Sequence, residues 1–370
     1  MKLKRIVRWS AGAILVALLA TALIAYWMSD NACDEGNNAA PRDPMRAIVY
    51  CDYGLADVLR LEDVEKPAPQ DNQLLIKVHA AALNPLDWHF VRGTPYVMRL
   101  QTGLRKPKVI QLGVDFAGTV EAVGKSVTQF KPGDEVFGGR TGAFAQYLCV
   151  GEDRAVVLKP ANLTFEQAAA VPIAAVTALQ GLRDKGQVRP GQKVLINGAS
   201  GGVGTFAVQI AKSFGADVTG VCSTRNIDLV RSLGADHVID YTKEDFTKSG
   251  ERYDLILDNV ANHSLSECRR VLAPKGKYVM IGGGGPNDGR WIGALGRPLL
   301  ALISSPFVSQ DMGMMLAELN KTDLTVLSDL MQAGKVTPVI DRRYSLSEVP
   351  AAIRYLEEGH ARGKVVIDVE

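Results

Sequence analysis

A cluster of small residues lies between an apolar run and a helical pattern near the middle of the chain. The run 194–196 (Val-Leu-Ile) precedes it, and the members of the cluster are Gly198, Ala199, Gly201, Gly202 and Gly204. Glycine lets the backbone turn tightly and approach a phosphate, and the free N–H groups of a helix N-terminus attract an anion. The pattern Ala199-x-Gly201-x-x-Gly204, which includes Val203, is a dinucleotide fingerprint with alanine in its first position. We therefore predict a pyrophosphate site; a tight turn without a ligand is the alternative.

Apolar runs and helical patterns alternate on the C-terminal side of this cluster. We expect strands at 216–222, 236–240, 253–258 and 277–281, with helices between most of them, for example at 226–233 and 263–272. Strands and helices that alternate at this spacing are typical of a parallel, doubly wound sheet. This is the context in which the glycine fingerprint binds a nucleotide.

The end of the second expected strand indicates which nucleotide is bound. An NAD site usually carries Asp or Glu there to hold the ribose hydroxyls. This chain has Ser223, Thr224 and Arg225 instead, with no acid before Asp228. Hydroxyl groups can donate hydrogen bonds, and a guanidinium pairs with a phosphate through its planar fork. The pattern favours a 2′-phosphate and hence NADP(H), although Arg225 as a solvated residue that opens the next helix is the alternative.

The composition excludes several classes of protein. The chain has 370 residues, a net charge of +2 and 47% hydrophobic residues, which suggests two domains with ample cores. The near-neutral charge gives no reason to expect nucleic acid as a partner. The five cysteines contain no C-x-x-C pair, so we expect neither a zinc ribbon nor a disulfide framework, only core or incidental thiols; they are Cys33, Cys51, Cys149, Cys222 and Cys268.

The first thirty residues differ from the rest of the chain. Four basic residues precede an uncharged run at 9–27, which at about nineteen residues is just long enough to span a bilayer as a helix. Aromatic residues occur at both ends of this run, as in membrane-interface belts. We predict a single N-terminal transmembrane helix at 1–30 that anchors the protein to a membrane, with a cleaved signal peptide as the alternative. The positive-inside rule puts the main body opposite the cytoplasm, against a mostly cytosolic cofactor, so the orientation is left open.

Residues 31–44 have the Asp, Asn, Gly and Pro content of a linker. Short β-rich runs separated by Gly, Pro and Asp follow, at 47–50, 73–78, 118–123, 135–137 and 143–150. They predict a compact, barrel-like β domain, which a helical stretch at 165–182 connects to the nucleotide domain. Glycines and prolines interrupt the apolar segment 291–307, so we interpret it as a lid or a dimer surface rather than a second membrane span. The chain ends in a predicted helix at 346–358 and a strand at 364–367.

With these features, the chain resembles zinc-lacking members of the medium-chain dehydrogenase/reductase superfamily, on the quinone oxidoreductase (zeta-crystallin-like) branch. The segments that carry the resemblance are 84–87 (Asn-Pro-Leu-Asp), 112–118, 131–137, 191–212, 233–241 and 360–367. The resemblance implies an α/β fold with a GroES-like β-barrel catalytic domain at 45–164, completed by 338–370, and a Rossmann NADP-binding domain at 165–337. It also implies an active-site cleft between the two domains. Relatives commonly look dimeric, which leaves the choice between monomer and homodimer open.

The same comparison bears on metal and reaction type. Zinc-dependent relatives carry a Cys-containing motif where this chain has 84–87, and Gly-His-Glu where it has 113–115 (Gly-Val-Asp). A catalytic zinc needs about three protein ligands, so we expect no metal. Without a Lewis acid, alcohol oxidation loses the group that ionises the alcohol. We therefore expect NADPH-dependent hydride transfer to a quinone or an α,β-unsaturated carbonyl.

Individual roles follow from the resemblance alone. It places Asn84 and Asp87 at the catalytic, nicotinamide end of the cleft and Thr177 at the nicotinamide carboxamide. It places Tyr241 near the adenosine and Lys364 at the 2′-phosphate region or the diphosphate. The alternatives are that Asn84 is a turn residue, that Thr177 bonds its own helix backbone, and that Lys364 is a solvated strand end.

A rival function belongs to another class. The chain could be a membrane-tethered module that binds NADPH with little turnover, as a redox sensor or an interaction partner. The predicted anchor supports this reading, because a detoxifying reductase does not need one. The intact pattern of the cleft favours the enzyme, and a tether would suit lipophilic quinones.

Overall fold

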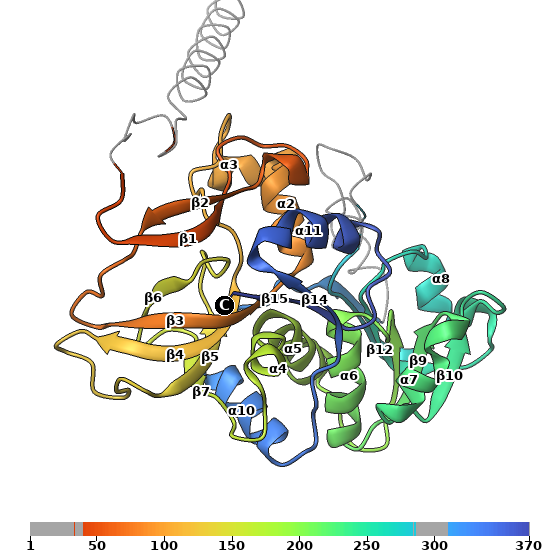
Figure 1. The fold of residues 1–370 in the computed structure, drawn as a ribbon. Helices are drawn as coiled ribbons and strands as arrows, with labels where there is room; N and C mark the ends of the chain where they lie inside the picture. The colour runs from red at the N-terminus through yellow and green to blue at the C-terminus, as the bar shows by residue number, and fades with distance from the viewer. Residues whose placement is uncertain (1–32, 34–39, 284, 286–309, 370) are drawn as a thin grey trace, which may run out of the picture.

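Figure 1 shows a β-rich body and a helix-covered parallel sheet packed side by side in the computed structural model, which describes residues 33, 40–283, 285 and 310–369. The apolar run at 9–27 and the segment 291–307 lie outside these residues, and so do the predictions made on them. Within the described residues, no helix is long and apolar enough to cross a membrane.

The N-terminal body contains a seven-stranded sheet and a small hairpin. The hairpin pairs β1 (Pro44–Val49) with β2 (Arg60–Glu65) in antiparallel fashion. The larger sheet has the order β14-β15-β3-β4-β5-β7, and β6 pairs with β3. Its strands are β3 (Gln73–Ala82), β4 (Asp115–Val123), β5 (Glu135–Gly139), β6 (Tyr147–Gly151), β7 (Val156–Leu158), β14 (Ile340–Ser345) and β15 (Lys364–Asp368). The alternation of buried and exposed residues is incomplete in β3 because one end of this strand is buried on both faces.

The second sheet is parallel and has the order β10-β9-β8-β11-β12-β13. Its strands are β8 (Lys193–Asn197), β9 (Asp217–Cys222), β10 (His237–Asp240), β11 (Tyr253–Asp258), β12 (Leu272–Met280) and β13 (Asp311–Met314). The helices that connect or cover these strands are α6 (Gly202–Ser213), α7 (Ile227–Ser232), α8 (Leu265–Arg270) and α10 (Lys321–Gln332). Four expected strands and two expected helices are thus present, within a few residues of the predicted bounds. The sheet also contains β13, which the sequence analysis did not predict.

Two further elements differ from expectation. The helical stretch expected at 165–182 is broken into α4 (Phe165–Ala169) and α5 (Pro172–Gln180). Pro172 explains the break, because proline has no N–H to continue a helix but is suited to the first turn of a new one. The chain end forms α11 (Val349–Glu357) and β15, as expected, and β14 is an additional strand beside β15.

A disulfide joins Cys33 to Cys51, with 5.9 Å between the two Cα atoms. The expectation that all cysteines are core or incidental thiols is therefore wrong for this pair. Spacing along the chain could not reveal it, because a disulfide needs only that the two Cα atoms come within about 7 Å in the fold. Cys149, Cys222 and Cys268 are free thiols.

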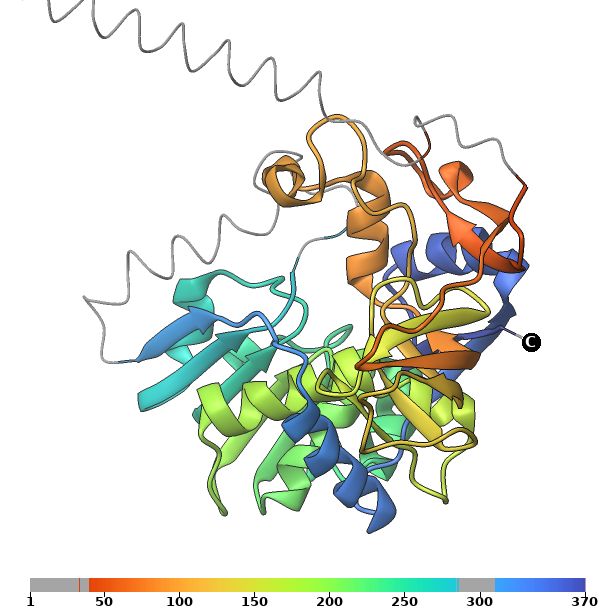
Figure 2. The same cartoon turned by 90° about the vertical axis from the view of Figure 1, so that its left-hand side faces the viewer.

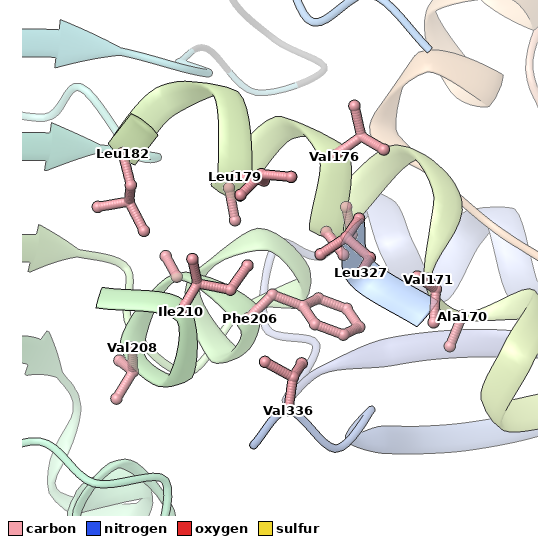
Figure 3. Close-up of a cluster of buried hydrophobic side chains, with 14 of the residues drawn as sticks. Ala170, Val171, Val176, Leu179, Leu182, Phe206, Val208, Ile210, Leu327 and Val336 are labelled. Atoms are coloured by element: carbon pink, nitrogen blue, oxygen red, sulfur yellow. The ribbon is translucent and has the colours of Figure 1, made fainter. Parts of the chain in front are cut away.

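The largest core lies between the parallel sheet and the N-terminal body. Figure 3 shows Phe206 of α6 close to Leu327 of α10 and Val336, with Leu179 of α5 nearby; all four are buried. Small residues on α5 (Ala174, Ala175, Ala178) let α5 and α6 approach each other closely. Because α6 starts at the glycine cluster, this packing also sets the position of the predicted pyrophosphate site.

We predict that Phe206→Ala lowers the free energy of unfolding by about 3–5 kcal/mol, because it removes a fully buried ring and leaves a cavity. Urea denaturation followed by circular dichroism measures the change. Leu316→Ala is the control, since this side chain is 80% exposed and its truncation should cost no more than about 0.5 kcal/mol. Equal effects of the two substitutions would contradict the assignment of this core.

Candidate active site

The glycine cluster forms the turn between β8 and α6. Gly198 has a φ of +77°, a conformation that favours glycine. A Cβ atom at Gly204 would lie 2.1 Å from the carbonyl oxygen of Gly198, so this position also requires glycine. Gly201 precedes the first turn of α6, and the nearest atom to a Cβ placed there is 3.5 Å away. The turn therefore presents the N–H groups at the start of α6, an arrangement that suits a pyrophosphate.

The turn also lies where the strand order reverses. Strands β9 and β10 follow on one side of β8, whereas β11, β12 and β13 follow on the other. Ligands of open α/β sheets bind outside the carboxyl ends of the strands at such a point. There, Asn197 donates a 2.9 Å hydrogen bond to Asp258, which also accepts one of 2.7 Å from the Tyr278 hydroxyl. This buried network, which the sequence analysis did not find, holds the ends of β8, β11 and β12 together.

The predicted 2′-phosphate residues follow β9. Thr224 and Arg225 are exposed, and Ser223 is half-buried. Asn226, also missed from the sequence, donates hydrogen bonds to Ser200 of the glycine turn (3.0 Å) and to Ser223 (3.2 Å). These bonds fix the end of β9 to the pyrophosphate turn, so the structure brings the two predicted parts of the nucleotide site together. Arg225 Nη2 donates to the carbonyl oxygen of His360 at 3.1 Å.

A carboxylate from the neighbouring strand β10 lies beside Thr224, although the sequence that follows β9 contains no acid before Asp228. Asp240 ends β10, and the Thr224 hydroxyl donates a 2.5 Å hydrogen bond to it. Hydrogen bonds from Thr224 and Thr242, with Lys243 at 3.3 Å, hold the pKa of Asp240 well below its usual range. Tyr241 follows it and is 54% exposed. Lys243 thus partly neutralises Asp240. The positive charges of Arg225 and Lys243 lie at this end of the site.

At the other end of the candidate site, Asn84 precedes α2 (Pro85–Arg92). Its backbone N–H donates to Asp87 Oδ2 at 2.7 Å, and its side-chain nitrogen donates to Asp115 Oδ2 at 3.0 Å. Asn84 and Asp87 form a capping box at the start of the helix. Asp87 is fully buried, and burial raises its pKa to about 7, although the Asn84 N–H opposes this shift. Asp87 therefore fixes the position of Asn84 and the first turn of α2.

Lys364 lies at the start of β15, and its side chain is 3% exposed. Its Nζ donates to Asn84 Oδ1 at 2.7 Å and to the Leu83 carbonyl oxygen at 2.9 Å, and it lies 3.2 Å from Asp115 Oδ2. Lys364 was expected at the 2′-phosphate region or the diphosphate; its ammonium here is bonded to Leu83, Asn84 and Asp115, and its role toward the diphosphate stays a prediction. The alternative of a solvated strand end is wrong, because the side chain is buried. The ammonium is held by Asn84 instead, because Asp115 supplies a buried counter-charge. The stem of Lys364 passes the glycine turn, 3.3 Å from where a Cβ at Gly202 would lie.

Asp115 connects this cluster to the nucleotide domain. Its Oδ1 accepts a 3.1 Å hydrogen bond from the backbone N–H of Ile173, in the first turn of α5. One turn further along α5, Thr177 donates its hydroxyl hydrogen to the Ile173 carbonyl oxygen at 2.6 Å, as the alternative interpretation had it. Burial raises the pKa of Asp115, and Lys364 opposes this shift. The signal for Asp115 in the sequence is a single carboxylate within the apolar segment 112–118.

These residues do not fit a catalytic zinc. Asn84 supplies an amide, and the only acids beside it, Asp87 and Asp115, already bind backbone and lysine groups. In the part of the chain that the structure describes, no three His, Cys, Asp or Glu side chains come close enough to hold a metal ion. The glycine turn and the cations around Arg225 do fit a dinucleotide with an additional phosphate.

Comparisons with known proteins agree with this geometry. Residues 70–161 match the alcohol dehydrogenase GroES-like domain family, and residues 233–367 match the zinc-binding dehydrogenase family. The chain is 38% identical to the 2-methylene-furan-3-one reductase of Solanum lycopersicum, over 87% of this chain and 79% of that protein. It is 36% identical to the chloroplastic NADPH-dependent alkenal/one oxidoreductase of Arabidopsis thaliana, with the same coverage of both chains.

A quinone oxidoreductase from Coxiella burnetii has a similar solved structure. The TM-score is 0.75 at 31% identity, over 89% of this chain and 100% of that one. The chain is also 33% identical to the chloroplastic quinone-oxidoreductase QR1 of Triphysaria versicolor, over 88% of this chain and 98% of that protein. The chain therefore belongs to the quinone oxidoreductase branch of the medium-chain dehydrogenase/reductase superfamily and is an NAD(P)H-dependent oxidoreductase that binds NADP(H).

Proposed function

We propose that the protein transfers a hydride from NADPH to a quinone or an α,β-unsaturated carbonyl without a metal ion. The observation that carries this proposal is the buried Lys364–Asn84–Asp115 cluster at the end of the cleft where zinc-dependent relatives hold their metal. The similar proteins from Solanum, Arabidopsis and Triphysaria, whose names describe enone and quinone oxidoreductases, support it.

The chemistry needs a hydride donor and a site for developing negative charge. Bound NADPH supplies the hydride. As an enone or quinone is reduced, negative charge develops on its oxygen, and preorganised donors stabilise such charge most strongly where water is excluded. The three N–H groups of Lys364 are bonded to Leu83, Asn84 and Asp115, so in this proposal Lys364 acts as a preorganised positive charge. Asn84 supplies the donor, because the second N–H of its side chain has only a long contact of 3.5 Å with the Ala82 carbonyl oxygen. Solvent can then protonate the resulting enolate or hydroquinone anion, so no dedicated acid is required.

The remaining residues bind the cofactor in this proposal. The turn from Ala199 to Gly204 holds the pyrophosphate, with Val203 in the first turn of α6. Ser223, Thr224 and Arg225 hold the 2′-phosphate, and Tyr241 lies beside the adenosine. Thr177 remains at the nicotinamide, where its hydroxyl oxygen can still accept a hydrogen bond from the carboxamide. Asp87 acts in this proposal as a positioning residue, because its Oδ2 accepts the backbone N–H of Asn84.

The alternative of a tethered sensor with little turnover gains no support from the similar proteins, whose names describe reductases and oxidoreductases. A direct test is NADPH consumption by the full chain with a panel of quinones and enones, in parallel with NADH and with a chelator. Turnover with NADPH that a chelator does not reduce supports the proposal. Tight NADPH binding without turnover on any acceptor would favour the sensor, and inhibition by the chelator would contradict a metal-free mechanism.

We predict that Arg225→Ala raises the KM for NADPH about 10- to 100-fold, because a hydrogen bond to a charged phosphate contributes about 1.5–3 kcal/mol. The KM for NADH should change less than about twofold, since NADH has no 2′-phosphate. Steady-state kinetics with both cofactors measures the difference. Arg231→Ala on α7 is the matched control and should leave both values unchanged. An equal loss for NADH and NADPH would remove Arg225 from the 2′-phosphate site.

We predict that Lys364→Met lowers kcat at least about 100-fold, consistent with the loss of a preorganised positive charge. It should also lower stability by about 3–5 kcal/mol, because Asp115 is left as an unpaired buried charge. The double variant Lys364→Met/Asp115→Asn separates the two effects, since it removes the unpaired carboxylate without restoring the positive charge of Lys364. It should recover stability but not kcat. Recovery of kcat together with stability would show that Lys364 is only structural.

A further inference from the structure

A stretch near the active site contains basic residues but no acids. Between Asp87 and Asp115 the chain has no Asp or Glu, and it contains Arg92, Arg99, Arg105, Lys106 and Lys108. The stretch forms most of α2, then η2 (Tyr96–Met98), α3 (Arg99–Thr102) and an irregular segment. We call residues 96–109 the amphipathic loop. The whole chain has a net charge of only +2, so this concentration of positive charge is a local feature.

The amphipathic loop also exposes apolar side chains. Val97 is 44% exposed, Leu100 69% and Val109 54%. Of nine large hydrophobic side chains that are exposed in the described residues, three thus lie within fourteen residues of the chain. Lys108 is exposed beside Val109, and Arg105 and Lys106 are partly exposed. Exposed apolar residues next to basic ones are typical of segments that lie on a membrane surface.

The loop is held in place by an aromatic residue near the disulfide. The Tyr53 hydroxyl donates to the Gly103 carbonyl oxygen at 2.7 Å and lies 3.0 Å from Thr102 Oγ1. The Arg99 guanidinium lies over the rings of Tyr53 and Tyr96, at 4.3 and 4.6 Å from their centres. Because these contacts order α3 before any partner binds, little conformational entropy remains to be lost on docking.

The position of the loop relative to the chain's N-terminal part is set by the Cys33–Cys51 disulfide. Cys51 is two residues from Tyr53, so Cys33 is covalently fixed near the base of the amphipathic loop. The uncharged run at 9–27 ends only six residues before Cys33. Figures 1 and 2 both show α3 at the edge of the molecule opposite α10. Cys33 is therefore fixed on the side of the fold where the loop projects.

We propose that the amphipathic loop docks on an anionic bilayer surface, with Val97, Leu100 and Val109 in the interface and the positive charge of the basic segment 105–108 at the headgroups. Arg99 stays packed against Tyr53 and Tyr96. Each Lys or Arg near an anionic surface contributes about 1 kcal/mol. Two acids on the neighbouring segment oppose this attraction, Asp52 and Asp57, but Arg354 binds Asp57. The proposal does not depend on which acceptor the enzyme reduces.

The test uses the full chain with vesicles of neutral phosphatidylcholine, and with vesicles in which about a third of the lipid is phosphatidylglycerol. Hydrogen exchange measured by mass spectrometry follows the backbone N–H groups of residues 96–109, with residues 325–335 on the opposite side as an internal reference. We expect exchange of the loop to slow about tenfold or more on the anionic vesicles relative to the neutral ones, without a change in the reference.

Matched variants identify the cause of the protection. Leu100→Glu/Lys108→Glu should abolish it while leaving NADPH turnover with a water-soluble quinone unchanged, since neither residue belongs to the cleft. Leu316→Glu/Lys335→Glu makes the same chemical change at exposed positions elsewhere and should retain full protection. Equal exchange on the two kinds of vesicle would overturn the proposal, and so would protection that survives in Leu100→Glu/Lys108→Glu.

Discussion

The buried carboxylate of Asp115 is the constraint around which the two halves of the molecule are arranged. An ionised carboxylate is costly to remove from water unless it is paired and hydrogen-bonded. Its three partners come from distant parts of the chain: Asn84 at the start of α2, Ile173 at the start of α5 and Lys364 at the start of β15. Satisfying this one group thus requires that the start of α2, the start of α5 and the C-terminal strand β15 meet at a single point.

The return of the chain end follows from this requirement. β15 pairs antiparallel with β3, and the register sets Val366 opposite Ala82, two residues before Asn84. That register places Lys364 at the end of β3 with its stem against Gly202 and its ammonium on Asn84. A single side chain therefore touches both ends of the candidate site, the pyrophosphate turn and the proposed acceptor end. Lys364 in this way links the start of α2 to the glycine turn through one side chain.

Local sequence patterns were sufficient for most elements and for the glycine turn, because their causes are local; β13, β14 and the break between α4 and α5 were missed. The fingerprint from Ala199 to Gly204 depends on steric limits within the turn itself, and the parallel strands are apolar runs that can be read directly. Asp115, Asp240 and the Cys33–Cys51 disulfide could not be identified in this way. Each acquires its role from a residue on another segment: Lys364 lies 249 positions from Asp115, and Asp240 meets Thr224 only because β9 and β10 are neighbours. Lys364 shows the same limit. The family resemblance identified it as a site residue but did not predict which groups its ammonium binds.

Helix α2 joins the proposed chemistry to the proposed membrane surface. Its first turn carries Asn84 and Asp87, and it ends at Gly93, whose left-handed conformation turns the chain into the amphipathic loop. Eight residues of α-helix span about 12 Å, so the loop and the acceptor end of the cleft are separated by little more than the length of one short helix. Arg99 strengthens this connection, because it donates to the carbonyl oxygens of Gly93 and Arg92 at the end of α2. A lipophilic acceptor leaving a bilayer at the loop would therefore have only this short distance to travel, which gives the basic, apolar loop a physical reason to lie where it does.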